Sequence, residues 1–168
     1  MIKVLKRIWN TLLNAILFIE FCLIIIFTLP NLFNIKPFVV TSGSMKSIYP
    51  VGSLIYVKKV SPSSVKVGDS ITFYLNDNIV ATHQVYEINK KEGYFKTRGV
   101  DNKDANGKII NDAKPVYFSN FIGTPIYCVP VMGSINLFIT KKPGLYVVLG
   151  ITILLVFISF VFDKIKKD

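Results

Sequence analysis

The sequence predicts a mainly β protein, in which one small antiparallel β domain lies between two transmembrane helices. Hydrophobic residues make up 51% of the 168 residues and charged residues only 18%, which is too apolar for an ordinary soluble domain. The apolar residues gather in two long runs near the chain ends. Between them, short runs rich in Val, Ile, Tyr, Phe and Thr alternate with Gly, Pro, Asn and Ser, which favours strands and turns. We therefore divide the chain into residues 1–30, 31–143 and 144–168.

The two apolar runs are long enough to cross a membrane. A helix that crosses a hydrocarbon core about 30 Å thick needs roughly 20 mostly apolar residues. Residues 145–162 contain no charged side chain. Residues 8–29 are also apolar, apart from a few polar side chains that include Glu20, to which we assign no role. Pro30 ends this first run, as expected where a helix meets a turn.

The first run has a second interpretation, because basic residues precede it as they do in a cleaved signal peptide. The run is longer than the 7–15 apolar residues of a signal peptide, and no small-residue cleavage site precedes Pro30. We therefore expect it to remain as an anchor.

Basic residues lie before the first span and after the second, and their position predicts how the chain is oriented in the membrane. They are Lys3, Lys6, Arg7, Lys164, Lys166 and Lys167. Because cytoplasmic flanks carry an excess of Lys and Arg, both ends are expected in the cytoplasm. The prediction is a two-span protein of the cell membrane with residues 31–143 on the extracytoplasmic face.

The charge and the cysteines exclude other classes. The formal net charge is +10, which by itself fits either nucleic acid or anionic membrane lipid. No basic run with interleaved aromatic residues lies between the spans, so we exclude nucleic acid and keep membrane lipid as a partner. Two cysteines are too few for a disulfide framework.

The segment between the spans contains six candidate strands. They are residues 38–41, 53–59, 69–75, 79–89, 94–98 and 120–129. Asp77 and Asn78 between two of these runs predict a two-residue hairpin turn. Residues 102–111 are predicted to be a polar loop.

His83 is the single histidine of the chain and lies in the candidate strand 79–89. If that strand alternates, His83 shares its more apolar face with Ala81 and Val85. A buried imidazole needs a hydrogen-bonding partner, and a backbone group would satisfy a purely structural histidine. Taken alone, His83 does not indicate catalysis.

Ser42 and Ser44 lie in the run Thr-Ser-Gly-Ser-Met at 41–45, directly after an apolar strand. A Ser/Gly-rich turn is the simplest interpretation. A serine hydroxyl becomes a nucleophile only when a positioned base accepts its proton, so Ser44 and His83 must be considered together. In the later run 97–106, Asp101 or Asp104 could orient the imidazole, while a solvated turn is the alternative.

Four stretches together resemble the type I signal peptidases, and specifically their endoplasmic-reticulum-type subgroup. They are Ser-Gly-Ser-Met at 42–45, Val-Gly-Asp at 67–69, Thr-His at 82–83 and Thr-Arg-Gly at 97–99. The resemblance extends over about residues 38–135. In this subgroup a histidine replaces the catalytic lysine of the ordinary bacterial enzymes, and His83 occupies that position.

The acid loop departs from the family's pattern. The family usually has one Asp directly after the Gly and another about seven residues after it, where this chain has Val100 and Asn106. One inserted residue would align Asp101 with the family's loop, so the resemblance favours Asp101 over Asp104 as the residue that orients His83.

The resemblance implies a membrane-bound serine endopeptidase, a signal peptidase I, that cleaves signal peptides from secretory precursors. In these roles Ser44 is the nucleophile, His83 is the general base, and the Ser42 hydroxyl joins the Ser44 N–H in stabilising the oxyanion. The family needs no metal or cofactor. Its implied partners are signal-peptide-bearing precursors, membrane lipid and further membrane subunits.

Three alternatives remain open from the residues alone. A Ser/Lys pair would use Lys58 or Lys59, although both follow the nucleophile closely and look like solvated charges at a strand end. A sortase-like site would combine Cys128, His83 and Arg98, but in that family the Arg normally follows the Cys. The third is a non-catalytic, membrane-anchored β module that assists assembly of secreted proteins, in which the Ser/Gly turn is only a turn.

Overall fold

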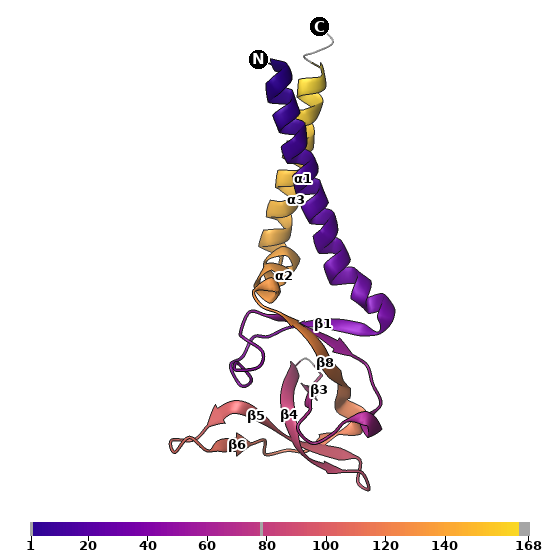
Figure 1. Ribbon diagram of the computed structural model, residues 1–168, viewed down its shortest axis with the longest axis vertical. Helices are drawn as coiled ribbons and strands as arrows, with labels where there is room; N and C mark the ends of the chain where they lie inside the picture. Colours follow the sequence, from indigo (N-terminus) through magenta and orange to yellow (C-terminus); the bar gives the residue numbers. More distant parts are fainter. Residues whose placement is uncertain (1, 78, 165–168) are drawn as a thin grey trace. The chain divides into compact units, whose positions relative to one another are not determined.

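The computed structural model describes residues 2–77 and 79–164, and the chain forms two compact units (Figure 1). A β unit comprises Pro30–Ile135, and a helical unit is built from the two ends of the chain, up to Leu29 and from Asn136 onward. The division between the two units at Ile135 and Asn136 lies within a helix, α2 (Met132–Thr140), which follows the last strand. The sequence analysis did not predict α2.

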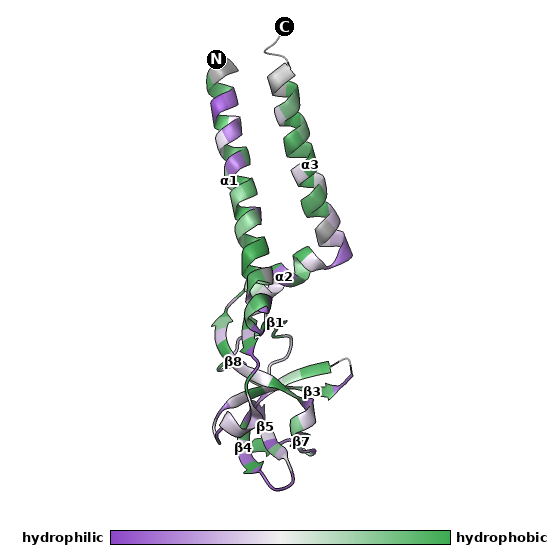
Figure 2. Ribbon diagram, turned by 90° about the vertical axis from the view of Figure 1, so that its right-hand side faces the viewer, coloured by the Kyte–Doolittle hydropathy of each residue, from purple (hydrophilic) through white to green (hydrophobic). Residues whose placement is uncertain are grey.

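The helical unit contains the two apolar helices α1 (Ile2–Thr28) and α3 (Lys142–Lys164). The candidate spans Val4–Phe33 and Lys142–Val161 are long and apolar enough to cross a membrane (Figure 2). The prediction of one apolar helix near each end is thus confirmed, although α1 begins at Ile2 rather than at residue 8. Of the basic residues used to predict orientation, Lys166 and Lys167 lie outside the described residues.

Glu20 and Thr152 connect the two long helices of this unit. The Thr152 hydroxyl donates to the Glu20 carboxyl at 2.7 Å and also lies 2.9 Å from the Val148 carbonyl of its own helix. Glu20 therefore has a hydrogen-bonding partner within the helical unit.

The β unit is an eight-stranded sheet with antiparallel pairing, which confirms the predicted fold class. The strands are β1 (Ile35–Val39), β2 (Leu54–Lys58), β3 (Ser70–Asn76), β4 (Ile79–Asn89), β5 (Tyr94–Lys103), β6 (Ile109–Asn111), β7 (Val116–Tyr117) and β8 (Phe121–Val129). Their order is β1-β2-β8-β3-β4-β5-β6, and β7 pairs with β5. Short 3₁₀ helices lie at Leu29–Phe33, Pro62–Ser64 and Phe118–Asn120.

Two prolines occupy strand positions that tolerate a missing N–H. Pro37 lies in β1, which is an edge strand. Pro125 lies in β8 opposite Val57, where the register of β2 and β8 shifts. Edges and bulges are where sheets accept proline, because no ladder hydrogen bond is lost there.

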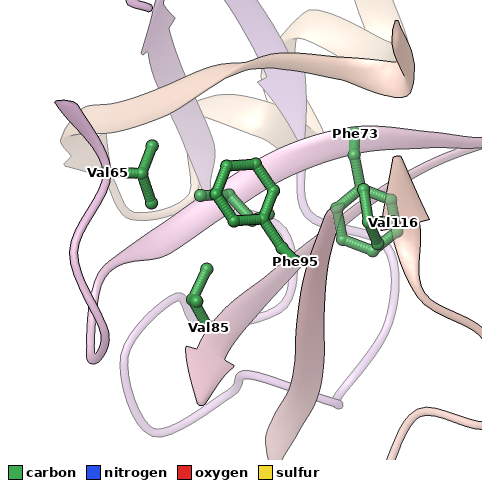
Figure 3. Close-up of a cluster of buried hydrophobic side chains, with 6 residues drawn as sticks. Val65, Phe73, Val85, Phe95 and Val116 are labelled. Carbon is green, nitrogen blue, oxygen red and sulfur yellow. The ribbon is translucent and has the colours of Figure 1, made fainter. Parts of the chain in front are cut away.

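The core is a cluster of buried side chains from β3, β4, β5 and β7 together with Val65 (Figure 3). Its buried side chains are Val65, Ile71, Phe73, Val85, Phe95 and Val116. Ala81 packs against this cluster, and the ring of Phe73 meets that of His83 edge-on at 6.1 Å between centroids. His83 thus lies on the core-facing side of β4, as the alternation predicts.

Two local predictions have different outcomes. The polar loop predicted at 102–111 is shorter than expected and comprises residues 104–108, because β5 continues to Lys103 and pairs with β6, which begins at Ile109. On either side of the predicted hairpin turn, β3 and β4 pair antiparallel, with Thr72 opposite Thr82. Asn78 itself lies outside the described residues.

Candidate active site

Ser44 lies in a tight turn of the segment between β1 and β2. The turn closes on itself, since the Lys46 N–H donates to the Gly43 carbonyl at 3.2 Å and the Tyr49 N–H donates to the Met45 carbonyl at 2.7 Å. Met45, only 2% exposed, anchors the turn in the β unit. Because Met45 is buried, the backbone of Ser44 is fixed in position, and its side chain lies near the surface of the β unit.

The Ser44 hydroxyl lies 3.1 Å from Nε2 of His83, and Nδ1 of the same ring lies 2.6 Å from Oδ2 of Asp112. An ionised carboxylate only accepts hydrogen bonds, so Nδ1 carries the ring proton. In the neutral ring Nε2 then accepts from the Ser44 hydroxyl. The three side chains form a continuous hydrogen-bonded series that has the geometry of a nucleophile, a base and an orienting acid.

Asp112 is held by Thr97 as well as by His83. The Thr97 hydroxyl donates to Asp112 Oδ2 at 2.6 Å, and the Asp112 N–H donates to the Thr97 carbonyl at 2.9 Å. Thr97 is fully buried, while the side chains of His83 and Asp112 are 12% and 24% exposed. The carboxylate is therefore fixed on both sides, and the imidazole has little room to rotate.

The expectation that Asp101 or Asp104 orients His83 is wrong. The Asp101 carboxylate instead accepts from the backbone N–H and the hydroxyl of Ser47, both at 2.8 Å. Asp104 accepts from two backbone N–H groups, those of Asn106 and Lys108, and so closes the turn between β5 and β6. The ring instead bonds Asp112, which the sequence analysis did not consider.

Asp112 reaches the ring because β6 returns the chain along β5. Arg98 pairs with Asn111, so the residue after Asn111 lies beside Thr97, the neighbour of Arg98. The available signal was the apolar pair Ile109 and Ile110, which a strand interpretation would have used and which Asp112 follows after one intervening residue, Asn111.

Asp101 has a different place in the site, since its segment of β5 braces the Ser44 turn. Its N–H donates to the Ser44 carbonyl at 2.9 Å, and the Val100 N–H points at the Met45 sulfur at 3.3 Å. Together with the two bonds from Ser47, these contacts fix both ends of the turn. We call this set of contacts the β5 brace.

The β5 brace depends on an ionised Asp101. The backbone N–H of Ser47, and then its hydroxyl, lower the pKa of Asp101 below its ordinary value, and Lys46 and Lys103 act in the same direction. A carboxyl with a lowered pKa stabilises the fold above the pKa of the unfolded chain. That contribution is lost as the pH falls through the lowered value.

Gly99 allows β5 to approach the nucleophile closely. A Cβ added there would lie 2.8 Å from the Ser44 carbonyl oxygen and 2.9 Å from the Ser44 Cβ. We expect Gly99→Ala to displace Ser44 from His83 and to lower kcat at least about tenfold, with a loss of about 1–3 kcal/mol in the free energy of unfolding. Steady-state kinetics and chemical denaturation check this.

Gly107→Ala is the matched control for Gly99→Ala. Gly107 has φ +80°, so alanine is strained there, but no atom lies within 4 Å of the added Cβ. This variant is expected to lose stability and keep its activity. Full activity of Gly99→Ala with unchanged kcat would contradict the proposed close approach.

Ser42 lies beside the nucleophile, with its hydroxyl 3.4 Å from that of Ser44. A donor at this distance can reach an oxygen that develops on a carbon bonded to Ser44. Its role in oxyanion stabilisation stays a prediction.

A cavity of about 380 Å³ opens beside Ser44 and His83, and we call it the nucleophile cavity. Its remaining walls come from β1 and the residues after it, Met45, Tyr49, Ile55, the end of β3 and the first half of β4. Within the described residues, β1 is a sheet edge, and β4 pairs with β5 only from Gln84 onward. An extended peptide in this cavity would thus meet strand edges on two sides.

The two alternative catalytic sets are not assembled. Lys58 and Lys59 are exposed and lie outside the lining of the nucleophile cavity. Cys128 faces Ile55 across β2 and β8, and Arg98 bonds Gln84 at 3.2 and 3.3 Å. Both ring nitrogens of His83 are already engaged by Ser44 and Asp112.

No metal site accompanies these residues. Across residues 2–77 and 79–164, no three His, Cys, Asp or Glu side chains lie together as a metal ion would require.

Comparison with known proteins gives one informative relative. The chain is 34% identical over 113 residues to signal peptidase I W of Bacillus subtilis (strain 168). The aligned region covers 59% of this chain and 60% of that protein, so the chain spans about three fifths of the length of its curated relative. No family model matches the sequence.

Proposed function

We propose that the chain is a type I signal peptidase, a membrane-bound serine endopeptidase that removes signal peptides from secretory precursors, because it is 34% identical over 113 residues to a signal peptidase I. The hydrogen-bonded series from Ser44 through His83 to Asp112 supports this proposal most directly. The same series favours the endoplasmic-reticulum-type subgroup, in which histidine is the base.

The proposed reaction is acyl transfer in two steps. The Ser44 hydroxyl attacks the carbonyl carbon of the scissile peptide bond while His83 Nε2 accepts its proton. The C–N bond then breaks, and Nε2 returns that proton to the leaving nitrogen. A water molecule then gives a proton to Nε2 and attacks the acyl carbon, the bond from that carbon to Ser44 Oγ breaks, and Nε2 returns the proton to Oγ. Asp112 stabilises the positively charged imidazole in both steps.

Negative charge develops on the carbonyl oxygen during both steps. The N–H of Ser44 and the hydroxyl of Ser42 are the proposed donors to this oxygen. Loss of one such donor typically costs about 3–4 kcal/mol of barrier.

The nucleophile cavity is the proposed site for the signal peptide's carboxyl end. Backbone hydrogen bonds from the edges of β1 and β4 would hold this segment extended, independent of its side chains. The cavity volume of about 380 Å³ is at the low end for ligand pockets, and several residues of an extended segment would share it, which favours small side chains. The small-residue pattern before signal-peptide cleavage sites fits this volume.

The proposed location follows from the two helices. We place the β unit on the extracytoplasmic face of the cell membrane, with α1 and α3 as spans. The reason is that basic residues precede the first span and follow the second, and such residues mark the cytoplasmic side. Membrane lipid and membrane-inserted precursors are then the partners, and further membrane subunits are compatible with this arrangement.

The test is processing of a precursor by the full chain in lipid vesicles. We expect one new N-terminus after a small residue, identified by mass spectrometry. Cys128→Ala and thiol alkylation are expected to change kcat/KM less than twofold, because both ring nitrogens of His83 are bonded to Asp112 and Ser44. Loss of processing in Cys128→Ala would instead favour a sortase-like site. An absence of any processing by the unmodified chain would favour the non-catalytic β module.

A further inference from the structure

A second cavity, of about 550 Å³, borders the base and the acid of the proposed site but not the nucleophile. The residues that matter for its chemistry are Tyr74, Leu75, His83, Asp112, Lys114 and Tyr117. His83 and Leu75 line both cavities, whereas Ser42 and Ser44 line only the nucleophile cavity. We call this second space the leaving-side cavity.

Cleavage divides the substrate into two halves with different positions. The acyl half stays bonded to Ser44, beside Ser42, and therefore belongs in the nucleophile cavity. The amine half must lie against His83, because Nε2 delivers the proton to the leaving nitrogen. The residues that follow the leaving nitrogen should therefore lie beside the imidazole and lead away from the nucleophile cavity. The leaving-side cavity meets both conditions.

The lining of the leaving-side cavity is largely apolar and open to solvent. Tyr74 is 42% exposed, Leu75 61% and Tyr117 52%, and Tyr117 is supported from one side by the edge of the Tyr94 ring at 6.1 Å. Exposed apolar side chains along a cavity favour burial of an apolar side chain from a ligand.

The two charged residues of this lining, Asp112 and Lys114, do not form an ion pair with each other. Asp112 already accepts from His83 and from Thr97 through the same oxygen. Lys114 is exposed, and its side chain forms no hydrogen bond or ion pair with another of the described residues. A ligand with a carboxylate would therefore meet a cation at the rim of an apolar cavity.

We propose that the leaving-side cavity binds the first residues after the scissile bond, and that it favours an apolar or aromatic side chain together with an acidic one. This inference rests on the proposed function. It extends that function to the mature part of the precursor, so that the enzyme selects its substrates partly by the protein it releases.

The first test reverses the charge of the cavity. Two precursors differ only in a Glu or a Lys among the first three residues after the cut, and kcat/KM is measured for the full chain in vesicles. We expect the Glu precursor to be preferred about two- to fivefold, as for an exposed ion pair, and Lys114→Glu to reverse that preference. Lys91→Glu changes an exposed lysine outside the lining and is expected to keep the original ratio.

The second test removes part of the apolar wall. Tyr117→Ala is expected to raise KM about threefold or more for a precursor with Phe after the cut, and to leave a precursor with Ser there unchanged. Equal ratios in the unmodified chain and in both variants would overturn the leaving-side cavity alone. Failure of the unmodified chain to cleave any precursor would overturn the proposed function and this inference together.

Discussion

Ser44→Ala is expected to abolish precursor cleavage, with kcat lowered by about 10⁴-fold or more. The hydroxyl is the only one that lies within hydrogen-bond distance of His83 Nε2 among the described residues. Ser42, 3.4 Å from Ser44, cannot replace it because its own hydroxyl is not bonded to the ring. Mass spectrometry of precursor and product in a single-turnover assay measures the residual rate.

His83→Ala is expected to lose as much as Ser44→Ala, and the double variant no more than either, because nucleophile and base act as one unit. Ser42→Ala removes one oxyanion donor and should lower kcat only about 10²- to 10³-fold. Ser63→Ala is the control, since Ser63 is an exposed serine in the short turn Pro62–Ser64. A Ser44→Ala protein that keeps more than about one hundredth of the activity would contradict the serine mechanism.

Asp112→Asn is expected to lower kcat by about 10³- to 10⁴-fold with little change in KM. Without the carboxylate, the imidazole is neither held in the tautomer that accepts from Ser44 nor stabilised when it becomes charged. The effect falls on the chemical step, because Asp112 faces the ring and not the nucleophile cavity. Pre-steady-state measurement of the acylation rate checks it.

Asp101→Asn and Asp104→Asn provide the comparison. Asp101→Asn weakens the β5 brace, and because it acts through the Ser44 turn we expect a loss of about tenfold. Ser47→Ala should resemble it, since it removes one of the same hydrogen bonds. Asp104→Asn is expected to stay within about threefold of the unmodified chain. A larger loss in Asp101→Asn than in Asp112→Asn, with the fold intact, would return the orienting role to Asp101.

The local pattern of the sequence was sufficient for most of the fold. Strand β4 was predicted at its observed bounds, because alternation of apolar and polar residues is a property of neighbouring residues. The two apolar helices were likewise predicted from length and composition alone. The helix α2 was missed, since its nine residues are apolar on most sides and show little periodicity.

The carboxylate that bonds His83 was a different kind of problem. Residues 102–111 are mostly polar and show no alternation of apolar and polar residues. Nothing in them therefore indicated that β5 continues and that β6 returns beside it. The register between β5 and β6 also shifts between Arg98 and Lys103. An error in this one hairpin was enough to choose Asp101 over Asp112.

The sequence by itself determined the two apolar helices, the β domain between them, and Ser44 and His83 as the residues to consider together. Only the tertiary structure decided that Asp112 completes the series, that Asp101 braces the turn, and that a second cavity borders His83. The reason is physical. Spans and strands follow from contacts between near neighbours in the chain, whereas the acid depends on pairing between residues brought together by a hairpin.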